Sequence, residues 1–271
     1  MTARWGKKKI MDWNPQPLDA ADVTVHRRGR GKPLVLLHCL GMTARFWDVL
    51  EPLADRYELI AYSFPGHGYT PLPAGQYGAP ELTAQLHMLA QREGLVKFHL
   101  AGISMGGSVA QHFAGTHPEM VDKLILCDCT PKYNEESRAN WPVRAGIARK
   151  DGVAALIPTL LQTFFTPGSV AENGPNVQFV RATFEACDSE GYARACEMLA
   201  MVDAEAEAKR ITAETLIMLG SNERQAFKDA AAWMRANIPG AAAVIEVPEA
   251  GHASVRERPA FCIEQFARFL G

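Results

Sequence analysis

Residues 98–107 read Phe-His-Leu-Ala-Gly-Ile-Ser-Met-Gly-Gly, and this stretch decides the fold. Its first six residues form a short apolar run, as in a strand that is buried on both faces of a parallel sheet. Ser104 follows the run, is flanked by Gly102 and Gly106, and precedes a helix-like segment. A serine on such a strand-to-helix turn projects its hydroxyl from the carboxyl edge of the sheet. We therefore predict that Ser104 is a nucleophile; the alternative is a serine that only caps the helix.

Further short apolar runs, rich in Leu, Ile and Val, lie on both sides of this strand and alternate with amphipathic stretches. They are residues 34–37, 59–62, 124–127, 215–219 and 244–247. Leu82, Leu86 and Leu89 have helical spacing, and a C-terminal helix is expected to begin near Pro259. The pattern predicts an α/β fold with a doubly wound, mostly parallel sheet of six buried strands.

The alternation stops between Thr130 and about Arg210, where prolines and glycines separate helical segments. An insertion of roughly 80 residues is too long for an ordinary loop, so we expect a helical cap over the strand ends. The Lys7-Lys8-Lys9 cluster is expected to lie in a solvated leader. The expected organisation is a leader at 1–21, a core at 22–130 and 211–271, and a cap at 131–210.

Composition excludes several classes of partner. The 28 Lys and Arg residues are balanced by 30 Asp and Glu, so the chain has no general attraction for nucleic acid or anionic membranes. We find no signal-like or membrane-spanning segment and expect a cytoplasmic protein that acts on a small molecule. The six cysteines match no zinc framework, so we expect reduced thiols and no metal. The oligomeric state is left open.

A serine hydroxyl needs a histidine base, and eight histidines compete for that role. His252 lies in a loop just past the last apolar run and before the last helix. It is also the only histidine that follows every candidate acid, which matches the order Ser, acid, His. We predict that His252 is the base.

The loop His38-Cys39-Leu40-Gly41 follows the first long apolar run. Its amide at Leu40 is expected to pair with the amide of Met105 as two donors to an oxyanion. We expect His38 to shape this loop and His67 to make a structural hydrogen bond, although contact with substrate stays open for both.

Two carboxylates compete to orient His252. Glu223 lies three residues past the glycine that ends the penultimate run, and Asp128 ends the run before the cap. We favour Glu223 and keep Asp128 as the alternative; otherwise Glu223 would be a helix-start residue and Asp128 a turn residue that binds local amides.

Five parts of the sequence resemble, in chain order, the hallmarks of the α/β-hydrolase family. They are residues 38–41, Phe64-Pro65-Gly66-His67-Gly68, residues 102–107, Glu223 and His252. The similarity covers residues 23–270, and the chain looks most like 3-oxoadipate enol-lactonases, including cap residues 141–144 and 164–166. It departs from the family pattern at Cys39, which is commonly glycine, at Ser63, commonly aspartate, and at Glu223, normally aspartate.

The resemblance implies hydrolysis of a lactone or carboxylic ester through an acyl-enzyme, without a cofactor. A dicarboxylate substrate would need a cation in the cap, and the pocket would have apolar walls. The candidate cations are Arg138, Arg144 and Arg149, and the other candidate pocket residues are His38, Trp141 and Phe165. Alternatively, the arginines lie on a solvated helix face, and Trp141 only packs the cap against the core. A carbon–carbon, amide or other ester hydrolase with the same triad stays open, as does a non-catalytic receptor.

Overall fold

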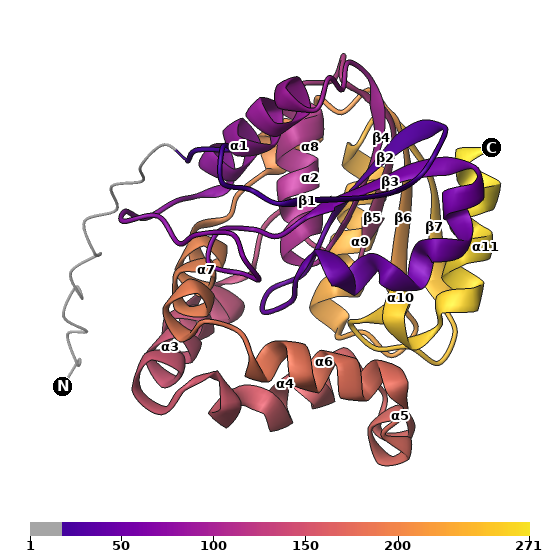
Figure 1. Ribbon diagram of the computed structural model, residues 1–271. Coiled ribbons are helices and arrows are strands. Elements are labelled where there is room, and N and C mark those ends of the chain that lie inside the picture. The colour runs from indigo at the N-terminus through magenta and orange to yellow at the C-terminus, as the bar shows by residue number, and fades with distance from the viewer. Residues whose placement is uncertain (1–17) are drawn as a thin grey trace, which may run out of the picture.

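The computed structural model describes residues 18–271, which form a sheet of seven strands covered by helices (Figure 1). The strands are β1 (Val25–Gly29), β2 (Lys32–Leu37), β3 (Tyr57–Tyr62), β4 (Phe98–Ile103), β5 (Val121–Cys127), β6 (Glu214–Gly220) and β7 (Ala241–Val247). Their order is β1-β3-β2-β4-β5-β6-β7, and only β1 runs antiparallel to its neighbour. The predicted mostly parallel α/β sheet is confirmed.

The two edges of the sheet differ from the expectation. Strand β1 was not predicted, because its sequence Val-His-Arg-Arg-Gly is mostly exposed and lacks an apolar run. Strand β7 was expected to be buried, but it lies at the other edge and its residues alternate in burial, with Val244 40% exposed. Successive side chains of a strand point to opposite faces of the sheet, so at this edge one face of β7 is covered less than the other.

The sheet order explains why distant loops meet. Leu37 of β2 lies opposite Gly102 of β4, so the loops that leave these two strands begin side by side. Strands β5, β6 and β7 continue in parallel, and the loops after them carry Asp128, Glu223 and His252 at the same carboxyl edge. All the loops that were expected to hold functional residues therefore converge on one edge.

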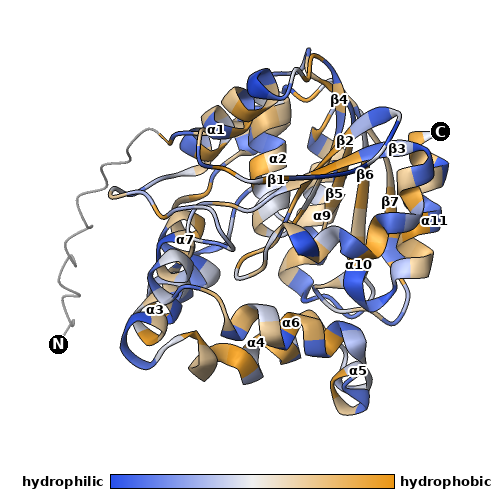
Figure 2. Ribbon diagram, in the orientation of Figure 1, coloured by the Kyte–Doolittle hydropathy of each residue, from blue (hydrophilic) through white to orange (hydrophobic). Residues whose placement is uncertain are grey.

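Helices cover both faces of the sheet. They are η1 (Ala44–Asp55), α1 (Ala79–Arg92), α2 (Met105–Thr116), α3 (Glu135–Asp151), η2 (Val153–Leu156), α4 (Ile157–Phe164), α5 (Pro167–Glu172), α6 (Pro175–Glu185), α7 (Ser189–Met201), α8 (Glu205–Ala208), α9 (Gln225–Asn237), α10 (Ser254–Glu257) and α11 (Pro259–Leu270). Figure 1 shows α1, α2 and α9 on one side and α11 on the other. The central strands are mostly hydrophobic in Figure 2, whereas the covering helices alternate, as their amphipathic spacing predicts.

The segment between β5 and β6 holds helices α3 to α8. Helices α3 to α7 form a layer apart from the sheet (Figure 1), whereas α8 packs against α2. Ion pairs join two helices of this layer, because Arg149 of α3 bonds with Glu190 and Glu197 of α7. The division at residues 131 and 210 stays a prediction.

The described chain begins within the expected leader. Leu18 and Ala20 are buried, and Gln85 of α1 donates its side-chain amide to the carbonyl of Asp19. Leu18 and Ala20 therefore pack on the core, and the boundary of the leader at residue 21 stays a prediction. The Lys7-Lys8-Lys9 cluster lies outside the described residues. No helix within residues 18–271 is long and apolar enough to cross a membrane.

Candidate active site

Ser104 sits on a strained turn between β4 and α2. Its backbone has φ 52° and ψ −117°, a conformation that L residues other than glycine rarely adopt. Its amide donates to the carbonyl of Cys127 at 2.9 Å, which anchors the turn to β5. The turn also needs its two glycines. A Cβ atom on Gly102 would lie 2.3 Å from the Gly106 carbonyl oxygen, and one on Gly106 would lie 2.2 Å from that of Leu37.

His252 lies between Ser104 and Glu223. Its Nε2 is 2.8 Å from the Ser104 hydroxyl oxygen, and its Nδ1 hydrogen-bonds with the Glu223 carboxylate. The sequence separations are 148 and 29 residues, so only the fold brings these groups together. A neutral imidazole that donates from Nδ1 presents an acceptor at Nε2 to the hydroxyl.

The loop after β6 holds Glu223 in place for this contact. The Glu223 amide donates to the Gly220 carbonyl at 3.0 Å, and one carboxylate oxygen accepts from the Arg224 amide at 2.8 Å. Burial acts to raise the pKa of Glu223, but the charge of His252 and the hydrogen bonds from His252 and Arg224 outweigh it and leave the pKa below its ordinary value. Glu223 is therefore held ionised beside the imidazole, despite the extra methylene of glutamate.

Asp128 occupies a different place. One carboxylate oxygen accepts from the Gly220 amide at 2.8 Å, and the other accepts from the amide and hydroxyl of Ser254 at 3.1 and 2.5 Å. Burial and the negative charge of Glu223 raise the pKa of Asp128 to about 7. Asp128 thus links the loop that carries Glu223 to the residue two positions after His252.

The two backbone amides predicted to bind an oxyanion lie in the loops that follow the paired strands β2 and β4. Met105 is the first residue of α2, where an amide has no partner within the helix, and Leu40 lies in the loop after β2. Neither amide donates a backbone hydrogen bond within residues 18–271. The next amide, that of Gly41, donates to the ring of His67 at 3.2 Å. The Leu40 and Met105 amides are therefore free to donate to an oxyanion, and that role stays a prediction.

His38 and His67 hold two loops together by reciprocal bonds. The ring of His38 accepts from the Phe64 amide at 2.9 Å and lies 2.7 Å from the Cys39 carbonyl, while His67 bonds with Gly41 and Pro65. Burial lowers the pKa of His38 to about 3 and that of His67 to about 4, so both rings stay neutral. Both ring nitrogens of His38 bond to backbone, which agrees with a role in shaping the loop, and its contact with substrate stays a prediction.

Sequence reasoning missed three aromatic side chains at the site. The rings of Phe227 and Phe164 lie 4.6 and 5.9 Å from the ring of His252. Burial raises the pKa of Tyr133, and its hydroxyl is close enough to Ser104 for a hydrogen bond that partly opposes the rise. Tyr133 and Phe227 each lie a few residues past the carboxyl end of a strand, and this position could have identified them as candidate site residues. Phe165, the neighbour of Phe164, is buried, and its predicted place in the substrate pocket stays a prediction.

The three cap arginines differ in their partners. Arg149 bonds with Glu190 and Glu197, and Arg138 donates to the Ala200 carbonyl at 2.8 Å. Arg144 forms no ion pair within residues 18–271, and its buried Nε has no hydrogen-bond partner there.

Arg144 lies between two aromatic rings of the cap. Its guanidinium carbon is 5.0 Å from the ring centre of Trp141 and 5.8 Å from that of Tyr192. Trp141 in turn contacts Tyr133 edge-on at 5.3 Å, and its buried Nε1 also lacks a partner in the described chain. Two donors of the cap helix α3 are thus buried without a partner in residues 18–271.

The histidine loop is joined to the cap. The amides of His252 and Ala253 donate to the carbonyls of Thr163 and Phe164 at 3.2 and 2.8 Å. The Glu257 carboxylate accepts from the amide and hydroxyl of Thr166 and, through its other oxygen, from the Gly251 amide at 2.7 Å.

Arg256 extends this connection to helix α6. Its guanidinium stacks on Phe179 at 3.6 Å and donates to Asn176 and to the carbonyl of Phe46. The end of α4 and the start of α6 are therefore fixed to the segment that carries His252.

No group of three His, Cys, Asp or Glu side chains within the described residues could hold a metal ion. The six cysteines carry free thiols, and all but Cys187 are buried.

Known proteins match this architecture. The model of the alpha/beta hydrolase family matches residues 34–265. The 3-oxoadipate enol-lactonase 2 of Acinetobacter baylyi is 27% identical over 89% of this chain and 91% of its own length. A pimeloyl-[acyl-carrier protein] methyl ester esterase of Aeromonas salmonicida is 38% identical, over 47% of this chain and 48% of its own. The enol-lactonase structure from Burkholderia xenovorans LB400 has a TM-score of 0.85 and 25% identity, covering 92% of this chain and 96% of that chain.

These similarities confirm the resemblance to enol-lactonases that the sequence motifs indicate. They agree with the mostly parallel sheet, the strained serine turn and the convergence of the loops at its carboxyl edge. The family model spans well over half of the chain. The chain therefore belongs to the α/β-hydrolase family.

Proposed function

We propose that the chain hydrolyses small carboxylic esters or lactones through an acyl-enzyme on Ser104, with His252 as base and Glu223 as the orienting acid. The observation that carries the proposal is the continuous relay from Glu223 through both ring nitrogens of His252 to the Ser104 hydroxyl. The names of the matched relatives, an enol-lactonase and a methyl ester esterase, support the same class of reaction.

The geometry suits a two-step reaction. The Ser104 oxygen attacks the substrate carbonyl carbon, and its proton moves to Nε2 of His252. The amides of Leu40 and Met105 bind the oxyanion, and each such donor contributes about 3 kcal/mol to transition-state stability. Collapse breaks the bond between carbonyl carbon and leaving oxygen, which takes the proton from His252. Water then attacks the acyl-enzyme, gives a proton to His252, and the proton returns to Ser104 as the acid is released.

We further propose that the substrate carries a second carboxylate, as a 3-oxoadipate enol-lactone does. Arg144 supports this, because its guanidinium has no acidic partner within residues 18–271 and its buried Nε is unpaired there. A buried guanidinium nitrogen without an acceptor is unfavourable, and a substrate carboxylate would supply one. The aromatic faces of Trp141 and Tyr192 would flank the same group.

A fluorophosphonate and a substrate panel test the proposal. The reagent should label wild type once, at Ser104, and should not label Ser104→Ala. The panel contains an enol-lactone with a free carboxylate, its methyl ester, a neutral lactone and an anilide. We expect the carboxylate-bearing lactone to have the highest kcat/KM. Failure of labelling would refute the mechanism, whereas a preference for the neutral lactone would refute only the substrate.

A further inference from the structure

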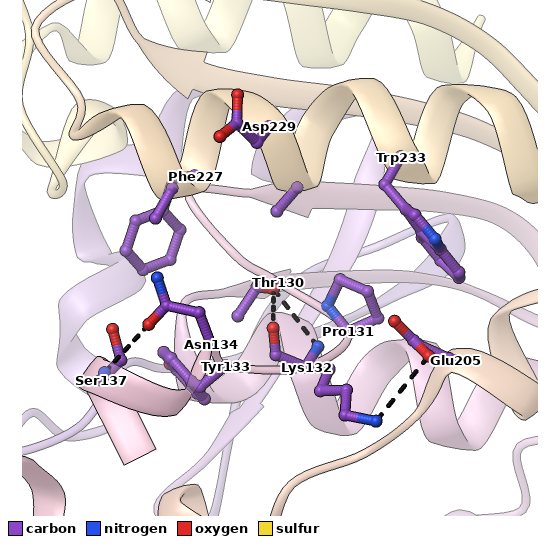
Figure 3. Close-up of a pocket in the computed structure, with 12 residues that line it drawn as sticks. Thr130, Pro131, Lys132, Tyr133, Asn134, Ser137, Glu205, Phe227, Asp229 and Trp233 are labelled. Carbon is purple, nitrogen blue, oxygen red and sulfur yellow. Dashed lines mark hydrogen bonds and ion pairs between the residues drawn. The ribbon is translucent and has the colours of Figure 1, made fainter. Parts of the chain in front are cut away.

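Ser104 and His252 are only 6% and 5% exposed, so a substrate needs a route to them. Two cavities flank the pair. The first, of about 250 Å³, lies between α9 and the segment from Thr130 to Ser137 (Figure 3). The second, of about 330 Å³, lies between Gly41, Thr43 and the end of α6 near Ala186. Neither cavity is lined by Ser104 or His252 themselves.

Two side chains that line the first cavity also border the catalytic pair. Phe227 lies 4.6 Å from the ring of His252, and the hydroxyl of Tyr133 is near enough to Ser104 for that residue to affect its pKa. The two rings meet edge-on at 6.3 Å. The side chains of Phe227 and Tyr133 lie between this cavity and the catalytic pair, and side chains can rotate on a nanosecond timescale.

The second cavity has a stiffer inner wall. It is bounded by the backbone at Gly41, whose amide is held by His67. A Cβ atom on Gly41 would lie 2.5 Å from the ring of Phe184, so a cap side chain packs directly on this loop. The bonds of Arg256 to Asn176 and of Glu257 to Thr166 fix the cap on this side. Access here would require the backbone to move.

The chemistry of the first cavity favours an uncharged ligand. Several of its polar groups are already paired: Thr130 donates to the Lys132 carbonyl, the Asn134 side chain accepts from the Ser137 amide, and Lys132 pairs with Asp203 and Glu205. Asp229 also lines the cavity and accepts from Gln225, and its negative charge disfavours an anionic group there. Figure 3 shows Phe227 and Trp233 projecting from the same helix into the cavity. The volume of about 250 Å³ equals roughly eight water molecules at about 30 Å³ each, enough for a small organic group.

We propose that this cavity is an entry subsite that binds the uncharged, apolar portion of the ester or lactone between Phe227 and Trp233. Rotation of Phe227 away from Tyr133 then opens the way to Ser104. The inference rests on the proposed function, because it needs Ser104 to be the group that the substrate reaches.

Two exposed alanines allow a matched test. Ala226 lines the first cavity and Ala186 the second, and neither is buried. The rate of labelling of Ser104 is measured with methyl and with naphthyl fluorophosphonate, each of which loses fluoride as the serine oxygen binds phosphorus. We expect Ala226→Trp to slow labelling by the naphthyl reagent at least about tenfold, and Ala186→Trp to change it less than about twofold.

A widening variant gives a second measurement if Ala226→Trp does not fold. Phe227→Ala should raise the ratio of naphthyl to methyl labelling about tenfold, and the ratio cancels any change in the reactivity of His252. Slow labelling in Ala186→Trp with normal labelling in Ala226→Trp would overturn the entry subsite, and so would an unchanged ratio in Phe227→Ala. Absence of label on wild-type Ser104 would instead overturn the proposed function, and this inference with it.

Discussion

The Asp128 carboxylate accepts hydrogen bonds from both the amide and the hydroxyl of Ser254, at 3.1 and 2.5 Å. Ser254 lies two residues after His252, so Asp128 acts on the loop, whereas Glu223 bonds to the imidazole itself. The two acids that compete in the sequence therefore have separate places in the fold.

Glu223→Gln is expected to lower kcat by up to about 10⁴, because the amide can neither fix the tautomer nor stabilise the imidazolium of His252. Asp128→Asn should lose less than about tenfold, since it disturbs only the loop. Steady-state kinetics on one activated ester compares them. A crippled Asp128→Asn beside an active Glu223→Gln would reverse the roles proposed for the two carboxylates.

Ser104→Ala and His252→Ala should each lower kcat by several orders of magnitude, and the double variant should be little worse than either. The hydroxyl and the imidazole act as one unit through their 2.8 Å contact, so when one is removed the other no longer contributes to catalysis. Turnover of all three variants, with thermal unfolding as the control for folding, checks this. Multiplicative losses would contradict the covalent mechanism.

Arg144→Gln is expected to raise KM for a carboxylate-bearing lactone about 10- to 100-fold, since a buried charged hydrogen bond contributes about 1.5–3 kcal/mol. It should leave KM for the matching methyl ester almost unchanged. Arg138→Gln is the matched control, because Arg138 lies on the same helix and donates to a backbone carbonyl. Equal effects of the two variants on both substrates would argue against an anion at Arg144.

Glu190 provides a test of stability against pH. Hydrogen bonds from Arg149 and Arg194 lower its pKa from 4.5 to about 2. The folded chain therefore binds this proton less readily than the unfolded chain, and the stabilisation is present above pH 4.5 and lost as the pH falls toward 2. Glu190→Gln should lower the unfolding temperature at pH 6 but not at pH 2.

Salt and a control residue sharpen that measurement. The deficit of Glu190→Gln should shrink in 1 M salt, because Glu190 is partly exposed and screened. Glu172→Gln changes an exposed carboxylate that forms no ion pair within residues 18–271, and should be close to wild type at each pH. A deficit that is constant from pH 6 to pH 2 would show that the Arg149–Glu190 pair contributes through packing rather than charge.

Local patterns predict the parts of this structure that local physics controls. The parallel strands follow from apolar runs, and the turn at Ser104 from its glycines, because both depend on neighbours in the chain. The edge strand β1 has no such signal, since it is held by pairing of its backbone with β3.

The surroundings of the site could not be predicted in the same way. The contact of Phe227 with His252 depends on how α9 packs, and the unpaired state of Arg144 depends on which acids reach the cap helices. Arg149 bonds with Glu190, which lies 41 residues further along the chain. Nothing in the sequence indicates that Arg149 forms an ion pair and Arg144 does not.

The amides of His252 and Ala253 donate to the carbonyls of Thr163 and Phe164, and these bonds limit which part of the cap can be replaced in remodelling this enzyme. A transplanted cap that replaces the end of α4 would remove two acceptors from the loop that carries His252. Helices α3 and α7 make no such bonds to that loop within the described chain, so their pocket-facing side chains can be redesigned as a module. Substrate specificity can then be varied through α3 and α7, while the end of α4 continues to hold the loop that carries His252.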